Sequence, residues 1–145
     1  MKRIILSVLV LGTLLTSCKK DDPAPQVCTL SATSLVGTYK ITSAVYKADA
    51  STAGVEVINN PLFFETCSAD DLIGFNANNS VTYTDAGTAC VPSSGGTGTW
   101  SLSGSVLTLD GDAATVTSFS CTNMIVSVSN FQMSGDNMTI TLTRQ

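Results

Sequence analysis

The stretch LIGFNANNSVTY, residues 72–83, decides the fold because two apolar arms flank an asparagine-rich centre, the pattern of an antiparallel hairpin. Two registers fit this stretch. A two-residue turn pairs Phe75 with Thr82 and mixes apolar and polar side chains on one face. A three-residue loop with Asn79 in the left-handed region pairs Phe75 with Val81 and keeps one face apolar, and asparagine tolerates positive φ better than most residues. We therefore expect the second register.

The same alternation of apolar and polar residues recurs along the chain and predicts an all-β protein. A first strand is expected near residues 35–45, a short strand at 55–58 and a last strand at 138–144. The expected inward positions of the first and last strands are Leu35, Gly37, Tyr39, Ile41, Val45, Met138, Ile140 and Leu142.

Three further hairpins are predicted where turn residues separate apolar arms. The expected facing pairs are Trp100 with Leu107 across a turn at 103–104, Phe119 with Val126 across a turn at 122–123, and Met133 with Met138 and Phe131 with Ile140 across a turn at 134–137. Each pairing places apolar side chains on one face of the sheet.

Eight or nine short strands in sequential hairpins close most economically as an up-and-down antiparallel β-barrel. The first strand then pairs with the last, and no edge stays open. A β-sandwich is the alternative, but its Greek-key crossovers need long connections, and only residues 48–60 supply one. Residues 34–145 have the length of one such domain.

The N-terminus has the three-part pattern of a secretory signal peptide. Lys2 and Arg3 precede an apolar run at 4–15, which ends in Leu15-Thr16-Ser17-Cys18, the pattern of a lipobox. A transmembrane helix needs roughly twenty apolar residues, so this run is too short to span a bilayer. We therefore expect residues 1–17 to be removed and Cys18 to carry lipid, which would hold the mature protein at a membrane.

Residues 18–33 are expected to comprise the acylated cysteine and a disordered tether, because the segment after Cys18 is polar and contains two prolines. The segment Cys18-Lys19-Lys20-Asp21-Asp22 resembles the export signal of Bacteroidetes-type surface lipoproteins. That resemblance implies a lipid anchor in the outer membrane with the protein exposed on the cell surface. Attachment at the periplasmic face is the alternative.

Charge excludes one large class of partners. From Cys18 onward, five basic residues stand against eleven acidic ones, a net charge of about −6. Without a basic stripe the chain lacks the electrostatic footprint of a nucleic-acid-binding protein. Only three cationic side chains lie in the expected domain, so its contact with anionic lipid would be weak.

Four cysteines remain when Cys18 is set aside for lipid, and an even number in an oxidising compartment predicts two disulfides. Extending the register of the 72–83 hairpin sets Cys67 one residue away from Cys90. A bulge near residues 68–71 would bring the two sulfurs into bonding range.

Cys28 and Cys121 are then paired by exclusion. A metal site is the rival interpretation of these cysteines. It is disfavoured because the chain has no histidine and no CxxC pair. No cofactor is expected.

Several segments together resemble one known family. They are the residues LVGTYKI at 35–41, CSADD at 67–71, FNANN at 75–79, Cys90, GTWSL at 98–102 and the closing strand at 138–144. This pattern looks like the lipocalin-like domain of small Bacteroidetes-type lipoproteins, with Tyr39 where the family usually has tryptophan and Asn78-Asn79 where it often has Asp-Gly. The resemblance implies a barrel with a cavity for a lipophilic ligand, names no shared ligand, and does not extend to the Cys28 and Cys121 pair.

Paired carboxylates are the candidate catalytic or calcium-binding groups, but each pair sits beside a turn. Asp70-Asp71 and Asp110-Gly111-Asp112 lie where aspartate is expected to bond the backbone, and neither supplies enough oxygens for calcium. Without histidine a Ser-His-Asp triad is excluded. The glycine-rich segment 92–98 precedes a strand and not a helix, so it cannot act as a phosphate-binding loop. We therefore expect no enzyme activity.

An inward aromatic set is the candidate binding site: Tyr39, Phe75, Tyr83, Trp100 and Phe119. Simple core packing explains these residues in a domain of this size, since an eight-strand interior is just wide enough for side chains or one small ligand. The functional hypothesis is that they line a cavity for a small lipophilic molecule. The alternative is a non-catalytic surface protein with a filled core, in which loops 49–60 or 91–97 contact a protein or a glycan.

Overall fold

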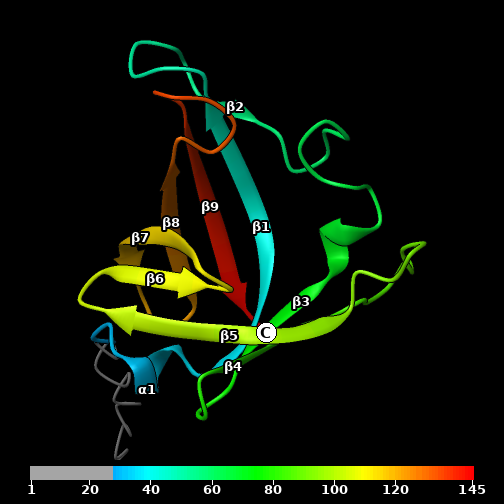
Figure 1. The fold of residues 1–145 in the computed structure, drawn as a ribbon, viewed down its shortest axis with the longest axis vertical. Helices are drawn as coiled ribbons and strands as arrows, with labels where there is room; N and C mark the ends of the chain where they lie inside the picture. Colours follow the sequence, from blue (N-terminus) through cyan, green and yellow to red (C-terminus); the bar gives the residue numbers. More distant parts are fainter. Residues whose placement is uncertain (1–27) are drawn as a thin grey trace, which may run out of the picture.

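Nine strands form one antiparallel sheet in the computed structural model, which describes residues 28–145 (Figure 1). The strands are β1 (Gly37–Lys47), β2 (Val55–Glu56), β3 (Leu72–Phe75), β4 (Ser80–Thr84), β5 (Gly96–Ser103), β6 (Val106–Leu109), β7 (Asp112–Phe119), β8 (Asn123–Ser129) and β9 (Asn137–Arg144). Strands β3 to β9 pair in sequence order, and β1 pairs with both β3 and β9. Eight strands therefore close into an up-and-down barrel, and the predicted fold is confirmed.

The β3–β4 hairpin has the predicted register. Phe75 faces Val81, and Ile73 faces Tyr83. Asn79 adopts the left-handed conformation with φ of 64°, as the three-residue loop requires. Keeping one apolar face was therefore the correct criterion for choosing between the two registers.

The β5–β6 hairpin forms with a register two residues away from the predicted one. Trp100 faces Leu109, and Leu107 faces Leu102. The turn residues are Gly104 and Ser105, with Gly104 at φ of 59° in the first turn position, which glycine favours in a two-residue hairpin. A shift of two residues keeps every side chain on its face, so the alternation alone could not reveal the error.

The β7–β8 hairpin is also offset from its prediction. Phe119 faces Met124, not Val126, and Val126 faces Val116. Residues 120–122 join the two strands, and the backbone N–H of Ser120 donates to the carbonyl of Asn123 at 2.8 Å.

The β8–β9 connection is a loop at 130–136 and not a continuation of the strands. Met138 faces Val128, and Phe131 and Met133 are exposed in the loop, so their predicted pairings are wrong. Buried Asp136 holds the loop by accepting backbone N–H groups from residues 131–133. Burial tends to raise the pKa of Asp136, but these bonds and the Tyr46 hydroxyl hold it below its usual value.

Strand β1 differs from its prediction at both ends. Leu35 lies in the short helix α1 (Ala32–Leu35), and the strand begins after it. A bulge after Ile41 changes the phase, so fully buried Ala44 takes the inward position that alternation assigned to Val45. Despite the bulge, β1 pairs with β9 from Tyr39 to Lys47.

Aromatic rings fill the interior next to α1. The rings of Tyr39 and Phe75 meet edge to face at 5.5 Å between centroids, and those of Phe75 and Trp100 at 5.4 Å. Together with Leu35 these side chains are almost completely buried. This end of the barrel, called the closed end below, is therefore plugged.

A second apolar cluster packs against β1 and β9, beyond the residues of β1 that pair with β3. Its buried members are Ala44, Val57 and Met138. The connection from β2 to β3 covers it, because Phe63 packs on Tyr46 with 4.8 Å between ring centroids. This connection ends in a 3₁₀ turn, η1 (Ser68–Asp70), where a bulge was expected.

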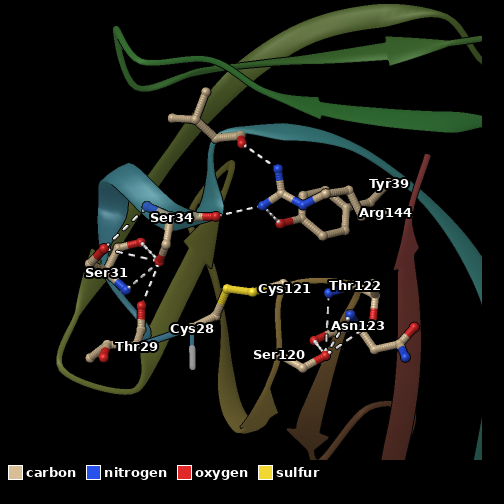
Figure 2. Close-up of a disulfide and its surroundings, with 11 residues drawn as sticks. Cys28, Thr29, Ser31, Ser34, Tyr39, Ser120, Cys121, Thr122, Asn123 and Arg144 are labelled. Atoms are coloured by element: carbon tan, nitrogen blue, oxygen red, sulfur yellow. Dashed lines mark hydrogen bonds between the residues drawn. A yellow bond between two sulfur atoms is a disulfide. The ribbon is translucent and has the colours of Figure 1, made fainter. Parts of the chain in front are cut away.

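Both predicted disulfides are present. Cys67 bonds to Cys90, and Cys28 bonds to Cys121 in the β7–β8 turn (Figure 2). The disulfide therefore ties Cys28, several residues before the expected domain start at residue 34, to the barrel. The predicted signal peptide, Cys18 and residues 19–27 lie outside the described residues.

No helix within residues 28–145 is long and apolar enough to cross a membrane.

Candidate functional site

An apolar cavity of about 190 Å³ lies inside the barrel. Its walls come from β1, β3 and the four strands β6 to β9. The lining residues are Ile41, Ile73, Phe75, Leu107, Leu109, Asp112, Ala113, Ala114, Val126, Val128, Ile140 and Leu142. Every one of them except Asp112 is apolar, so the cavity can hold an apolar molecule but offers few groups to orient a polar one.

Of the five aromatic residues predicted to line a ligand site, Phe75 alone is in this wall. Tyr39 and Trp100 are 1% and 3% exposed, and they fill the closed end instead. Tyr83 and Phe119 are partly buried against the main core but do not line the cavity. The wall is mainly aliphatic, which is a correction to the predicted aromatic set.

Small side chains explain why the space exists where it does. Ala113 and Ala114 occupy the start of β7, and Ala114 faces Leu107 on the neighbouring strand. The large aromatic rings pack edge to face next to α1, and the side chains around the cavity beyond Phe75 are mainly aliphatic. Two adjacent alanines in a strand were the signal in the sequence that could have located the cavity.

Arg144 and the groups that it contacts form a cluster at the closed end of the barrel (Figure 2). Arg144 donates to the carbonyls of Ser34 and Val36 and to the Tyr39 hydroxyl, at 2.5, 2.8 and 2.6 Å. Its guanidinium also lies 4.9 Å from the centre of the Tyr39 ring. Burial raises the pKa of Tyr39, although the Arg144 charge acts in the opposite direction, so this tyrosine is a neutral structural group at neutral pH.

Helix α1 begins with a capping box, and Arg144 bonds the carbonyls at its C-terminal end. The Ser31 side chain accepts from the backbone N–H of Ser34, and the Ser34 side chain accepts from the backbone N–H of Ser31. Gly37 follows the helix, and a side chain there would overlap the Arg144 guanidinium. The sequence analysis missed this helix, whose signal was the serine pair three residues apart.

The end of the cavity away from α1, called the rim, carries the Asp110-Gly111-Asp112 motif. Asp110 has φ of 49° and begins a two-residue turn between β6 and β7. Its carboxylate accepts from the Thr99 N–H and from the Tyr83 hydroxyl, both at 2.7 Å, and these bonds lower its pKa. Burial and the neighbouring Asp110 raise the pKa of Tyr83.

The other carboxylate pair, Asp70-Asp71, bonds the backbone of the connection after β4. Asp71 accepts from the N–H of Ala86, and Asp70 from that of Thr88. Within residues 28–145, the two groups of three neighbouring acidic or cysteine ligand atoms both contain Cys90, whose sulfur is held in a disulfide. These carboxylates therefore have a structural role, as their position beside turns predicted.

The sequence matches the family described as lipocalin-like domain over residues 35–140, which is well over half of the chain. No curated protein and no solved structure matches it. The lipocalin-like family consists generally of non-catalytic binding proteins. The closed eight-strand ring and its internal apolar cavity agree with this match, and the chain belongs to the lipocalin-like domain family.

Proposed function

We propose that this chain is a membrane-anchored lipoprotein whose barrel binds one small lipophilic molecule without catalysis. The observation that carries the proposal is the apolar cavity of about 190 Å³ inside the barrel. Aliphatic side chains line this cavity, so an apolar ligand that fills it would remove their surface from water, which is favourable.

The cavity volume sets the size of the ligand. An apolar cavity of about 150 Å³ in another protein holds benzene, and drug-sized ligands need about 300 Å³ or more. The molecule that fits is therefore a single ring with a short substituent, or a short branched alkyl chain. A long fatty acid would leave most of its chain outside.

The lipobox ending in Cys18 supports a lipid anchor, and the position of Cys28 indicates where the tether would join the barrel. Cys28 is bonded to Cys121, at the end of β7 remote from Asp112 on the cavity rim. A tether from Cys18 would therefore join the barrel on the side away from this rim. Lipid on Cys18 would hold the protein in the outer membrane, facing the cell surface, and leave the cavity accessible to solvent.

Filling the cavity tests the binding proposal. Ala114→Phe places a phenyl ring in the cavity, and we expect it to abolish the saturable binding of ethylbenzene that the unmodified protein shows by NMR titration. Thr115→Phe is the matched control, because Thr115 is exposed on the same strand and does not line the cavity. Urea titration of both variants checks that overpacking costs no more than about 3 kcal/mol.

Binding that survives in Ala114→Phe, or no binding by the unmodified protein, would overturn the proposed site. Attention would then move to loops 49–60 and 91–97 as contacts for a protein or a glycan. Val55 and Val91 are 59% and 96% exposed there.

The anchor is tested separately in the native cell. Cys18→Ala is expected to release the protein from the membrane fraction, because the acyl chains are the proposed attachment. Protease added to intact cells should degrade the unmodified protein. Survival in intact cells together with cleavage in lysed cells would assign the protein to the periplasmic face instead.

A further inference from the structure

We propose that the ligand is an apolar molecule with an ammonium or hydroxyl headgroup, and that Asp112 at the rim selects it against carboxylic acids. This inference rests on the proposed binding function and specifies its chemistry. It rests on the position of the Asp112 carboxylate, which has no hydrogen-bond partner within residues 28–145 and lies beside an otherwise apolar cavity.

Asp112 is the first residue of β7 and the one polar residue among those that line the cavity. It is exposed, and its side chain makes no hydrogen bond or ion pair with any residue between 28 and 145. Its neighbour Asp110 is fully engaged with Thr99 and Tyr83. The Asp112 carboxylate is therefore free to accept a hydrogen bond from a bound molecule.

Most other carboxylates in the described domain accept a hydrogen bond from a backbone N–H of another residue. Acceptors of this kind are Asp49, Glu56, Asp70, Asp71, Asp85, Asp110 and Asp136. Asp112 has no such role, because no backbone N–H within residues 28–145 donates to its carboxylate. A turn requirement therefore does not account for its side chain.

The charge of the domain around the cavity also favours a ligand ammonium group over a ligand carboxylate. Residues 28–145 contain nine acidic and three basic side chains, and none of the three basic ones lines the cavity. Arg144 is held at the closed end by Ser34, Val36 and Tyr39. A ligand carboxylate would therefore meet Asp112 without a compensating cation, whereas an ammonium group would be attracted.

The cavity walls and the rim would contact different parts of the ligand. The apolar body would lie against Leu107, Val126 and Leu142, which are nearly completely buried. The headgroup would remain at the rim, partly in water, so its desolvation cost is small. The attraction is screened for the same reason, and its contribution to selectivity should be modest.

Four ligands with the same ring and carbon chain test the inference: phenylpropylamine, phenylpropanol, phenylpropanoate and propylbenzene. The protein is the chain from residue 19 with both disulfides formed, because residues 28–145 already close the barrel around its own core. Calorimetry at neutral pH is expected to rank the amine first and the acid last, with roughly a tenfold ratio between them.

Asp112→Asn is expected to reduce the amine-to-acid ratio by about threefold or more, and Asp112→Lys to reverse the order. Glu65→Gln is the control, because it removes the same charge from an exposed residue that does not line the cavity, and it should leave the ratio unchanged.

Binding of propylbenzene, which has no headgroup, distinguishes the selective role of Asp112 from the binding capacity of the cavity. Binding of propylbenzene with equal affinities for amine and acid, or an unchanged ratio in Asp112→Asn, would overturn the role of Asp112 and leave the cavity as a binding site. Failure of all four ligands to bind would overturn both the inference and the proposed function.

Discussion

Replacing both Cys28 and Cys121 by alanine is expected to lower the free energy of unfolding by about 4 to 5 kcal/mol. The two cysteines are 93 residues apart, so the bond removes a large part of the conformational freedom of the unfolded chain. Urea denaturation of the variant with the other disulfide intact, followed by tryptophan fluorescence, measures the loss.

The matched comparison is the double replacement of Cys67 and Cys90. These residues are 23 apart, so we expect a smaller loss of roughly 3 kcal/mol. A larger loss for this pair than for Cys28 and Cys121 would contradict loop closure as the main contribution. It would indicate that the 85–95 connection depends on its disulfide for native structure.

Arg144→Ala is expected to destabilise the protein by about 3 kcal/mol. The substitution leaves two carbonyls and the buried Tyr39 hydroxyl without their charged donor, and it removes the contact with the Tyr39 ring. The free energy of unfolding from a urea titration gives the value directly. Loosened α1 should also appear as faster amide exchange at Leu35.

Two controls separate geometry from charge. Lys40→Ala removes the same charge from β1, and the Lys40 side chain has no hydrogen bond with residues 28–145, so little effect is expected. Arg144→Lys keeps the charge, but one ammonium cannot match the planar guanidinium, so only part of the stability should return. Equal stability of the lysine variant and the unmodified protein would show that charge alone matters.

The fold was predictable because its main determinants are local. Alternation with period two gave the strands, and the asparagine at position 79 fixed one register through its tolerance of positive φ. Sequential hairpins then left barrel closure as the economical solution, and β1 does pair with β9.

The details that failed depend on interactions that alternation does not report. Moving Trp100 from Leu107 to Leu109 leaves the apolar face unchanged, so the pattern could not distinguish the registers. Loop 130–136 exists because Asp136 gathers backbone N–H groups. The bulge after Ile41 moves inward positions by one residue, which a strict period cannot anticipate.

The site was harder to predict than the fold for a volumetric reason. Large aromatic residues attract attention as ligand contacts, but Tyr39 and Trp100 pack against Phe75 and fill space. The cavity arises where side chains are small, at Ala113 and Ala114. A cavity depends on the sum of volumes around the barrel, and this sum requires the true registers.

The most direct test of ligand binding in the barrel is analysis of protein purified from its native cells. The unmodified protein, denatured and extracted with solvent, should release one small lipophilic molecule per chain by mass spectrometry, and Ala114→Phe purified in parallel should release none. Extracts that contain no such molecule, or the same amount of it from both proteins, would contradict ligand binding in the barrel cavity.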